Sequence, residues 1–302
     1  MRFSVLIATY NREEYLRQAV DSVLSQSFLD YEIIVINDGS NDSTSSILRT
    51  YEKKIKVINQ ANQGPEAAHR AGAMLASGEY LVFLDDDDLF LPWTLAVYDK
   101  VINSLDSPPV VFGSMLYFNQ GESIPAYTTM INGVEVLEYP NYFSKDITIG
   151  PSSSRIVVLK SVFDKLANEG KICSKKTFPL NDVNLILHVG MYGPCVIVVC
   201  PVTVLYRRHS TNVINNVEKI GHALLSLMHD IRQERSSESW FNIFAKEAHL
   251  GGLVVSWTLQ ALRNRRLWLA FRILLSGLPM VILGGLKKLC LLSRRRTRIT
   301  KI

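Results

Sequence analysis

The 302-residue sequence is poor in the features that identify several common protein classes. Its four cysteines form no CxxC pair and no zinc-finger spacing, which excludes a cysteine-bound zinc module. No glycine-rich loop carrying a lysine follows a strand, which argues against a nucleotidyltransferase. The chain also lacks internal repeats and low-complexity stretches. Hydrophobic residues make up 47% and charged residues 20%, so we expect a folded protein with a sizeable core.

Acidic residues are absent from the C-terminal segment 262–302, which carries eleven lysines and arginines. The other 261 residues hold 22 basic and 28 acidic groups, so the body of the protein is mildly acidic. A nucleic-acid-binding protein would not divide its charge in this way, and we expect no nucleic-acid partner. The apolar run Phe3–Ala8 is too short for a signal peptide, and the cysteines are unpaired, which predicts a cytoplasmic body.

Strand and helix signals alternate along the first hundred residues. Short apolar runs predict buried strands, and apolar residues spaced three or four positions apart predict helices. The alternation predicts an α/β fold, with a mainly parallel sheet flanked by helices and with ligands at the carboxyl ends of the strands. The expected strands are Phe3–Ala8, Tyr31–Ile36, Ile55–Asn59, Tyr80–Leu84, Val110–Phe118 and Cys195–Cys200, and the expected helices include one capped by Asn11, Thr44–Tyr51, Pro65–Ala76 and Pro179–Tyr192.

Four consecutive carboxylates, Asp85 to Asp88, follow the strand Tyr80–Leu84. Adjacent carboxylates repel one another, and a divalent cation relieves that repulsion. Hard oxygen ligands suit Mg²⁺ or Mn²⁺, which can hold a diphosphate as a leaving group. The alternative interpretation is a solvated acidic turn, but the position directly after a strand favours a metal site.

Polar residues also follow other strands at the same edge. Tyr10, after Thr9, can stack on a base, and Asp38 can accept a hydrogen bond from a base N–H. Arg70, on a helix, can reach a base carbonyl or a phosphate, whereas its neighbour His69 is expected to be exposed. Each signal is weak alone, since a packing tyrosine, an Asp-Gly turn or a solvent-facing arginine would explain it equally well.

Together these segments resemble the inverting glycosyltransferases of family 2, which have a nucleotide-sugar-binding fold of the A type. The resemblance covers residues 1–100 closely and 178–215 loosely, in FSVLIATYNREEYLRQAVDSVLSQSF, YEIIVINDGSNDST, NQGPEAAHRAGAMLASGEYLVFLDDDDLFLP and a later piece. It implies a nucleotide-sugar donor, with UDP favoured over GDP or dTDP. By resemblance, the nucleotide-sugar site contains Thr9, Tyr10, Asp38, Arg70, Asp85 and Asp86, and Asp87 binds the metal.

The later piece supplies a candidate base and a candidate metal ligand. In the family a Glu-Asp pair opens a helix, and its Asp is the general base. Here Asn181 replaces the Glu, whereas Asp182 is present and can deprotonate an acceptor hydroxyl. A helix N-cap is the alternative interpretation of Asp182. His209 is a candidate ligand of the metal, although a histidine after a strand is more often structural.

The chain divides by pattern into a catalytic domain, 1–215, and a helical, basic extension, 216–302. Residues 1–100 form the nucleotide-binding half and residues 101–215 the acceptor half. The uninterrupted apolar part of the tail, Ile273–Leu286, is shorter than the about 20 residues of a membrane span, and Pro279 weakens a straight span. Its basic flanks favour an element lying on an anionic membrane surface through 263–302. Helices packed on the core, or a dimer interface, are the alternatives.

The function predicted from the sequence is transfer of a sugar to a hydroxyl of a lipid-linked glycan in cell-surface polysaccharide biosynthesis. The enzyme would act at the inner face of the membrane. A polyprenyl-phosphate sugar synthase is the first alternative, because a phosphate acceptor needs less of a base. A non-catalytic, nucleotide-sugar-binding scaffold is the second, because Asn181 departs from the family pattern.

Overall fold

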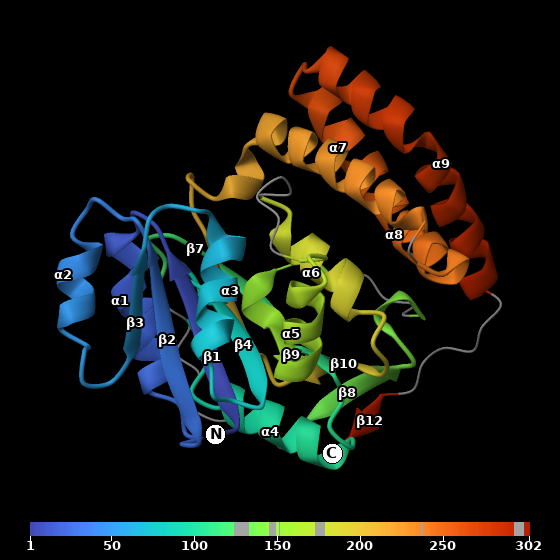
Figure 1. Ribbon diagram of the computed structural model, residues 1–302. Helices are drawn as coiled ribbons and strands as arrows, with labels where there is room; N and C mark the ends of the chain where they lie inside the picture. The colour runs from blue at the N-terminus through green and yellow to red at the C-terminus, as the bar shows by residue number, and fades with distance from the viewer. Residues whose placement is uncertain (124–132, 145–148, 151, 173–178, 237, 293–298) are drawn as a thin grey trace.

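The computed structural model describes residues 1–302 except 124–132, 145–148, 151, 173–178, 237 and 293–298. Its centre is a nine-stranded sheet with the order β12-β8-β10-β6-β9-β4-β1-β2-β3 (Figure 1). Within this sheet β8 and β9 run against the other strands, so the sheet is mixed and mostly parallel, which confirms the predicted fold class. The strands are β1 Phe3–Thr9, β2 Tyr31–Asp38, β3 Lys56–Gln60, β4 Tyr80–Asp85, β6 Val110–Phe112, β8 Glu135–Tyr139, β9 Ile156–Leu159, β10 Cys195–Cys200 and β12 Thr300–Lys301.

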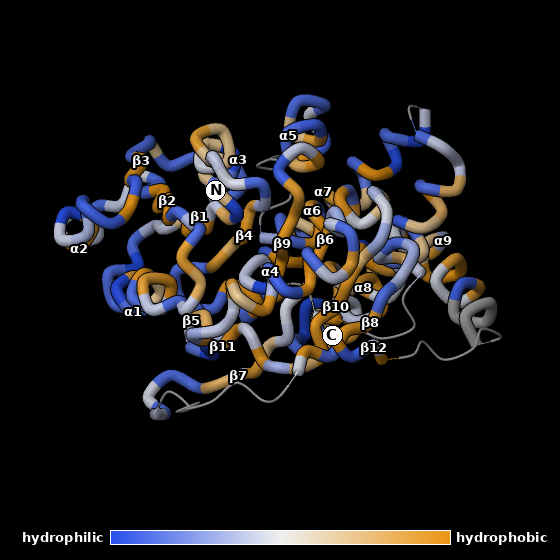
Figure 2. The backbone as a smooth tube through the Cα atoms, turned by 90° about the horizontal axis from the view of Figure 1, so that it is seen from below, coloured by the Kyte–Doolittle hydropathy of each residue, from blue (hydrophilic) through white to orange (hydrophobic). Residues whose placement is uncertain are grey.

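Helices cover both faces of this sheet. Alternate residues of a strand point to opposite faces, and both sets are apolar here, so both faces must be buried. On β1, Val5 and Ile7 pack in the cluster that includes α1, α2 and α4, whereas Leu6 packs in the cluster that includes α3, α5 and α6. Burial on both faces explains the continuous apolar runs of the strands, visible in orange in Figure 2. The helices are α1 Glu13–Leu24, α2 Thr44–Arg49, α3 Pro65–Leu75, α4 Thr94–Ser104, α5 Lys160–Asn168 and α6 Asn181–Val189.

A second sheet of three strands has the order β5-β11-β7, with β5 Leu89–Phe90, β7 Met115–Asn119 and β11 Val204–Arg208. The prediction of one strand over Val110–Phe118 is therefore wrong. The chain leaves the large sheet after Phe112, and the carbonyl of Ser114 accepts hydrogen bonds from the backbone N–H groups of Thr203 and Val204. After these bonds, the second half of the apolar run pairs with β11 as strand β7 of the small sheet.

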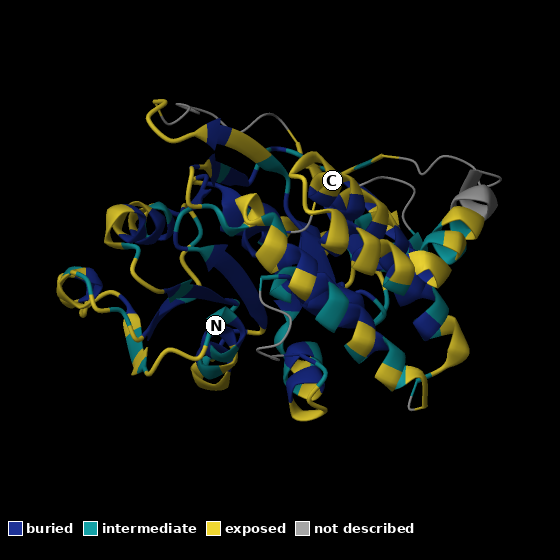
Figure 3. Cartoon of the chain, turned by 90° about the horizontal axis from the view of Figure 1, so that it is seen from above, coloured by how far each residue is buried: buried dark blue, intermediate teal, exposed yellow. Residues whose placement is uncertain are grey.

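Three long helices form the C-terminal extension at one end of the molecule: α7 Val217–Gln233, α8 Trp240–Arg263 and α9 Leu267–Leu292 (Figure 1). α8 and α9 lie side by side with glycines at the contact. A Cβ added to Gly251 would lie 2.1 Å from the carbonyl oxygen of Met280, so only a glycine permits this backbone approach. Many residues of the extension are exposed, as the yellow parts of its helices in Figure 3 show.

The end of the chain returns from the extension to the large sheet. β12 pairs with β8, and Ile302 and Val134 exchange backbone hydrogen bonds of 2.9 and 3.1 Å. The extension that we placed at 216–302 is therefore joined to the α/β part at both of its ends. α9 is a helix of 26 residues that continues through Pro279, so the proline expected to weaken a straight span does not end the helix.

Candidate active site

A cavity of about 1050 Å³ lies at the carboxyl ends of β1, β2 and β4, where the sequence predicts a ligand site. Thr9, Tyr10, Asp38 and the residues 85–87 line it from the sheet side. Further lining comes from the extension, which contributes the residues Lys219, Ile220, Leu253, Ser256, Trp257 and Gln260. The cavity is thus polar and acidic at the strand ends and more apolar along α8.

Three carboxylates of the acidic run converge beside this cavity. One carboxylate oxygen from each of Asp85, Asp87 and Asp88 lies within 4.8 Å of the other two. Burial and the charge of Asp87 raise the pKa of Asp85 to about 7 and hold the pKa of Asp88 well above its usual range. This repulsion is what a divalent cation relieves, and oxygen ligands suit Mg²⁺ or Mn²⁺, so the residues present fit the predicted metal. Asp86 is buried in the cavity lining, outside this group of three.

Residues distant in the sequence hold the acidic run in place. Ser154 Oγ donates to Asp88 Oδ2 at 2.6 Å and accepts from the backbone N–H of Asp85 at 3.0 Å. Ser153 Oγ donates to Asp85 Oδ1 at 2.5 Å, and the backbone N–H of Arg207 donates to Asp88 Oδ1 at 2.9 Å. Asp88 is fully buried, so it braces the cluster from inside the protein. Sequence reasoning missed these serines, because they lie in the irregular middle of the chain and carry no motif.

Asp38 organises the loop that follows β3. Its buried carboxylate accepts hydrogen bonds from Gln60 Nε2 at 2.7 Å and from the backbone N–H groups of Gln63 at 2.8 Å and Gly64 at 2.7 Å. Gly64 has φ +87°, a conformation that favours glycine. Asp38 therefore shapes the wall of the cavity as well as lining it.

The loops after β1 and β2 are also joined to each other. Asn11 does not cap α1 as predicted: it has φ 52°, and its side-chain oxygen accepts from the backbone N–H of Asn41 at 2.9 Å. Instead, Asp42 Oδ2 accepts from the backbone N–H of Glu13 at 3.2 Å. The helix is thus capped from the neighbouring loop, which joins the ends of β1 and β2.

Asp182 lies in the first turn of α6 and lines the cavity. The N-cap of this helix is Leu180, so the interpretation of Asp182 as the N-cap is wrong. Burial raises the pKa of Asp182 to about 6, although the backbone N–H of Val183 donates to its carboxylate at 2.7 Å. Its charge in turn raises the pKa of Asp85, so the two carboxylates interact electrostatically.

A family model described as "Glycosyl transferase family 2" matches residues 4–165, more than half of the chain. The chain belongs to this family. Among curated proteins, an uncharacterized glycosyltransferase of Nostoc sp. is 40% identical over 110 residues, which are 35% of this chain and 34% of that protein. Glycosyltransferase GlyA of Streptococcus pneumoniae is 32% identical over 127 residues, 41% of this chain and 18% of that protein. The matched segments thus span about a third of the Nostoc relative and less of GlyA.

Among solved structures, residues 1–349 of S. aureus TarS in complex with UDP-GlcNAc superpose on this glycosyltransferase with a TM-score of 0.63. The sequences are 18% identical, and the match covers 83% of this chain and 71% of the TarS chain. The corresponding TarS complex with UDP gives a TM-score of 0.61. At this identity the likeness shows the fold, which is the A-type fold predicted from the sequence.

His209 of the glycosyltransferase contacts Asp87 and lies outside the cavity lining. Its Nε2 lies 2.9 Å from Asp87 Oδ2, and its Nδ1 lies 2.9 Å from Thr211 Oγ1. The ring stacks on Tyr15 with centroids 4.9 Å apart. These contacts orient the Asp87 carboxylate, and the role of His209 as a direct metal ligand stays a prediction.

The side of α3 that meets the cavity carries Glu66 and His69, and the exposed Arg70 is not among the lining residues. The structure thus gives no support for contact between Arg70 and the nucleobase. The prediction that His69 is exposed is wrong, since it packs edge-on against Phe83 with centroids 5.0 Å apart. Burial lowers the pKa of His69 to about 4, so its ring is neutral at pH 7.

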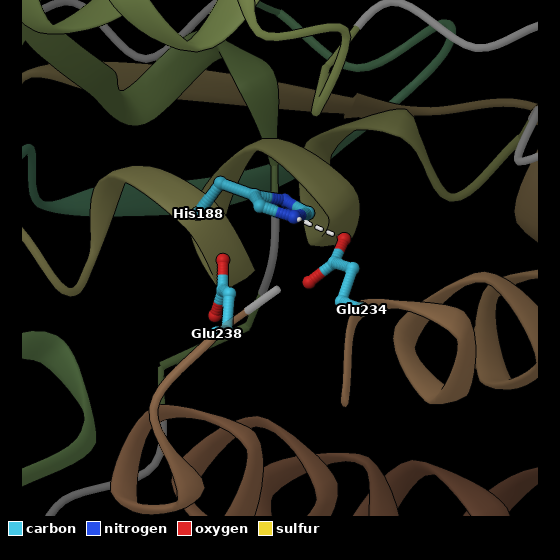
Figure 4. A group of neighbouring side chains, drawn as sticks. All are labelled: His188, Glu234 and Glu238. Atoms are coloured by element: carbon cyan, nitrogen blue, oxygen red, sulfur yellow. Dashed lines mark hydrogen bonds and ion pairs between the residues drawn. The ribbon is translucent and has the colours of Figure 1, made fainter. Parts of the chain in front are cut away.

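A second titratable cluster joins α6 to the extension. His188 of α6 faces Glu234 and Glu238, which follow α7 (Figure 4). The buried Lys246 of α8 lies between these two glutamates, with its Nζ 2.6 Å from Glu234 and 3.0 Å from Glu238. Burial alone would raise the pKa of Glu234, but His188 and Lys246 lower it to about 2. Because Lys246 already supplies the positive charge that a metal would bring, this cluster is an ion-pair network.

Proposed function

We propose that the glycosyltransferase moves a sugar from a nucleotide-sugar donor, with inversion, to a hydroxyl of a lipid-linked glycan in cell-surface polysaccharide biosynthesis. The single observation that carries this proposal is the cavity that joins the acidic cluster at the strand ends to Asp182 on α6. UDP is the favoured nucleotide, and the match to TarS, whose structures contain UDP-GlcNAc and UDP, supports it.

The donor side of the cavity follows from its residues. In the proposal Thr9, Tyr10 and Asp38 surround the nucleobase, and Asp85 and Asp86 approach the ribose and diphosphate. Asp87 and Asp85 would hold Mn²⁺ or Mg²⁺, and the buried Asp88 would support them from inside the protein. That ion, when bound, neutralises the diphosphate and makes it a better leaving group. The intact acidic cluster favours a catalyst over a non-catalytic scaffold.

Asp182 supplies the base for the transfer. In its ionised form it takes the proton of the acceptor hydroxyl, and the hydroxyl oxygen forms a bond to the anomeric carbon. The bond from that carbon to the nucleoside diphosphate breaks on the opposite face, which inverts the configuration. A pKa of about 6 leaves Asp182 ionised at pH 7 while keeping its basicity above that of an ordinary aspartate. This favours a hydroxyl acceptor over the phosphate acceptor of a polyprenyl-phosphate sugar synthase.

The extension suits contact with the inner face of a membrane, which is the location that we propose. Exposed apolar side chains recur every three or four residues along α9 and form a continuous stripe. Trp268 is 70% exposed and Leu275 is 62% exposed, which is unfavourable in water and favourable against a lipid surface. The members of the stripe are Leu267, Trp268, Phe271, Leu274, Leu275, Leu278, Ile282 and Leu286.

By length and composition, Leu267–Lys287 is the one helical segment in the described part of the chain that could cross a membrane, with a mean hydropathy of 1.9. Both ends of α9 are nevertheless tied to the same body. At its start, the backbone N–H of Arg266 donates to the carbonyl of Ala261 in α8 at 2.9 Å, and at its end Thr300 pairs with β8 only eight residues after Leu292. Eight residues reach at most about 29 Å, whereas a helix of this length extends about 39 Å. These ties support a helix that lies on the bilayer.

Calorimetric titration with UDP, GDP and dTDP, each with and without Mn²⁺, tests the donor site. We expect one nucleotide to bind and to require the metal, and Asp87→Ala to abolish the metal-dependent part. Lys100→Ala, an exposed change on α4, is the control. Metal-independent binding of equal strength in the Asp87 variant would contradict the assigned metal site, and binding of none of the three nucleotides by the folded protein would overturn the proposed donor.

A further inference from the structure

A second cavity, of about 780 Å³, adjoins the active-site cavity. Its lining comes from the loop after β11, the first turn of α7 and the turn between α8 and α9. We call it the basic groove, because Lys219, Arg265 and Arg266 line it against a single acidic residue, Glu218. The groove and the active-site cavity share a wall made of Asn212, Val213, Asn215 and Lys219.

The positive charge of the basic groove is only partly compensated. Arg266 lies 3.5 Å from Glu218, but both side chains are more than half exposed, so this pair is weak. Arg265 forms no ion pair with any residue that the structure describes. The turn that carries both arginines is closed by backbone hydrogen bonds from Arg265 to Leu262 and from Arg266 to Ala261, at 3.0 and 2.9 Å. The two guanidinium groups therefore belong to a defined turn.

The basic groove also lies at the border of the apolar stripe on α9. Leu262 precedes the turn, and Leu267 and Trp268 follow it, with exposed fractions of 45%, 69% and 70%. On the other side, Arg12 lines the active-site cavity and donates from Nη1 to Thr211 Oγ1 of the groove at 2.9 Å. An apolar surface, a basic groove and the catalytic cavity thus follow one another in space.

We infer that the basic groove binds the phosphate or diphosphate that joins the acceptor sugar to its lipid chain. This inference rests on the proposed function, which places the acceptor hydroxyl beside Asp182. A lipid-linked acceptor consists of an apolar chain, an anionic linkage and a sugar, in that order. These parts match the apolar surface, the basic groove and the catalytic cavity, which follow one another in the same order. Guanidinium groups bind phosphate oxygens through paired N–H donors, which suits Arg265 and Arg266 to this ligand. The wall shared with the catalytic cavity favours the acceptor's phosphate over that of an ordinary bilayer lipid.

Binding of farnesyl diphosphate, farnesol and inorganic pyrophosphate to the full chain tests this inference. We expect farnesyl diphosphate to bind more tightly than farnesol or inorganic pyrophosphate alone. The double variant Arg265→Glu/Arg266→Glu should weaken this binding by about tenfold or more, since one charge-assisted hydrogen bond contributes at least a factor of about ten. Arg263→Glu is the matched control, because Arg263 is exposed in the same segment but does not line the groove. Arg265→Ala alone should weaken the binding of farnesyl diphosphate by less than the double variant does.

Two further measurements separate the possible outcomes. Vesicles of phosphatidylcholine with phosphatidylglycerol offer headgroup phosphates without a polyprenyl chain. If the double variant loses vesicle binding but keeps farnesyl diphosphate, the groove binds headgroups, and the inference is overturned. Equal losses in the double variant and in Arg263→Glu would also overturn it. UDP binding with Mn²⁺ should be unchanged in the double variant, and its absence from the unmodified protein would instead contradict the proposed donor site.

Discussion

At the scale of single residues, Asp182 governs the expected pH dependence of the transfer. Its carboxylate acts as a base only when ionised, and burial raises its pKa to about 6. With saturating Mn²⁺ holding the neighbouring Asp85 in its ionised form, activity at low donor concentration should therefore rise about tenfold per pH unit below pH 6 and level off above it. Steady-state rates between pH 4.5 and 8 check this. A rising limb near pH 4, the range of an unperturbed aspartate, would contradict the role of the buried carboxylate.

Replacing Asp182 by asparagine should separate binding from catalysis. The amide keeps the size of the side chain but cannot accept the proton, so turnover should fall about 10²–10⁴-fold while nucleotide binding is retained. Asp30→Asn, an exposed change on the loop before β2, is the control and should behave as the unmodified enzyme. Rates of Asp182→Asn and Asp30→Asn that agree would remove Asp182 from the mechanism.

Ser154, which is distant from the acidic cluster in the sequence, supports that cluster through two hydrogen bonds. Ser154→Ala removes the donor to Asp88 and the acceptor for the backbone N–H of Asp85. Loss of such support costs about 10–100-fold in metal affinity, so the Mn²⁺ concentration for half-maximal activity should rise by that factor. Turnover at saturating Mn²⁺ should recover most of its value. Ser46→Ala, on the exposed side of α2, should leave the Mn²⁺ requirement unchanged.

At the scale of elements, Lys246 joins the helix that carries Asp182 to the extension. Its side chain is 1% exposed and lies between Glu234 and Glu238, so Lys246→Met removes the cation that these two half-buried carboxylates share. His188 then remains beside Glu234 and Lys171 beside Glu238. Removing one partner of a buried ion pair lowers the free energy of unfolding by about 3–5 kcal/mol. Chemical denaturation measures this loss, and the exposed Lys100→Met should cost little. A double variant with Glu234→Gln should be less destabilised than Lys246→Met alone, and an equal or larger loss would argue against the network.

The first half of the fold could be predicted because its information is local. β1, β2 and β4 are buried on both faces, so each contains a continuous apolar run, and loops rich in Asn, Asp and Gly follow two of them. In the second half, the strand over Cys195–Cys200 and the helix within Pro179–Tyr192 could also be predicted, but most of the other strands could not, because tertiary pairing decides them. β9 runs antiparallel between β4 and β6, and the two-residue β12 is a strand only because β8 offers it an edge.

The same distinction applies to the site. The acidic run and Asp38 stand directly after strands, so their place in the cavity follows from the parallel sheet. Ser154 and the buried Asp88 could not be assigned, since their roles come from contacts between segments more than sixty residues apart. On α3 the helical pattern predicted the helix but not the directions of the Arg70 and His69 side chains. Adjacent positions point in different directions, and the sequence alone did not tell which of them faces the cavity.

At the scale of the whole molecule, the exposed stripe of α9 should hold the enzyme on a membrane without crossing it. Replacing Trp268, Phe271 and Leu275 by glutamine removes apolar side chains that are each more than half exposed, so the fold should be retained. Each buried aromatic or leucine contributes about 1.5–3 kcal/mol, and binding to phosphatidylglycerol vesicles should fall by far more than tenfold. Sedimentation with vesicles measures this.

A matched triple replacement distinguishes the stripe from exposed apolar residues elsewhere on the protein. Leu29, Met74 and Leu75 are also exposed but lie away from the extension, so their change to glutamine should leave vesicle binding intact. Alkaline carbonate should release the unmodified enzyme from membranes, because both ends of α9 are joined to one folded body. An enzyme that resists carbonate would require α9 to cross the bilayer, and the pairing of β12 with β8 would then have to break.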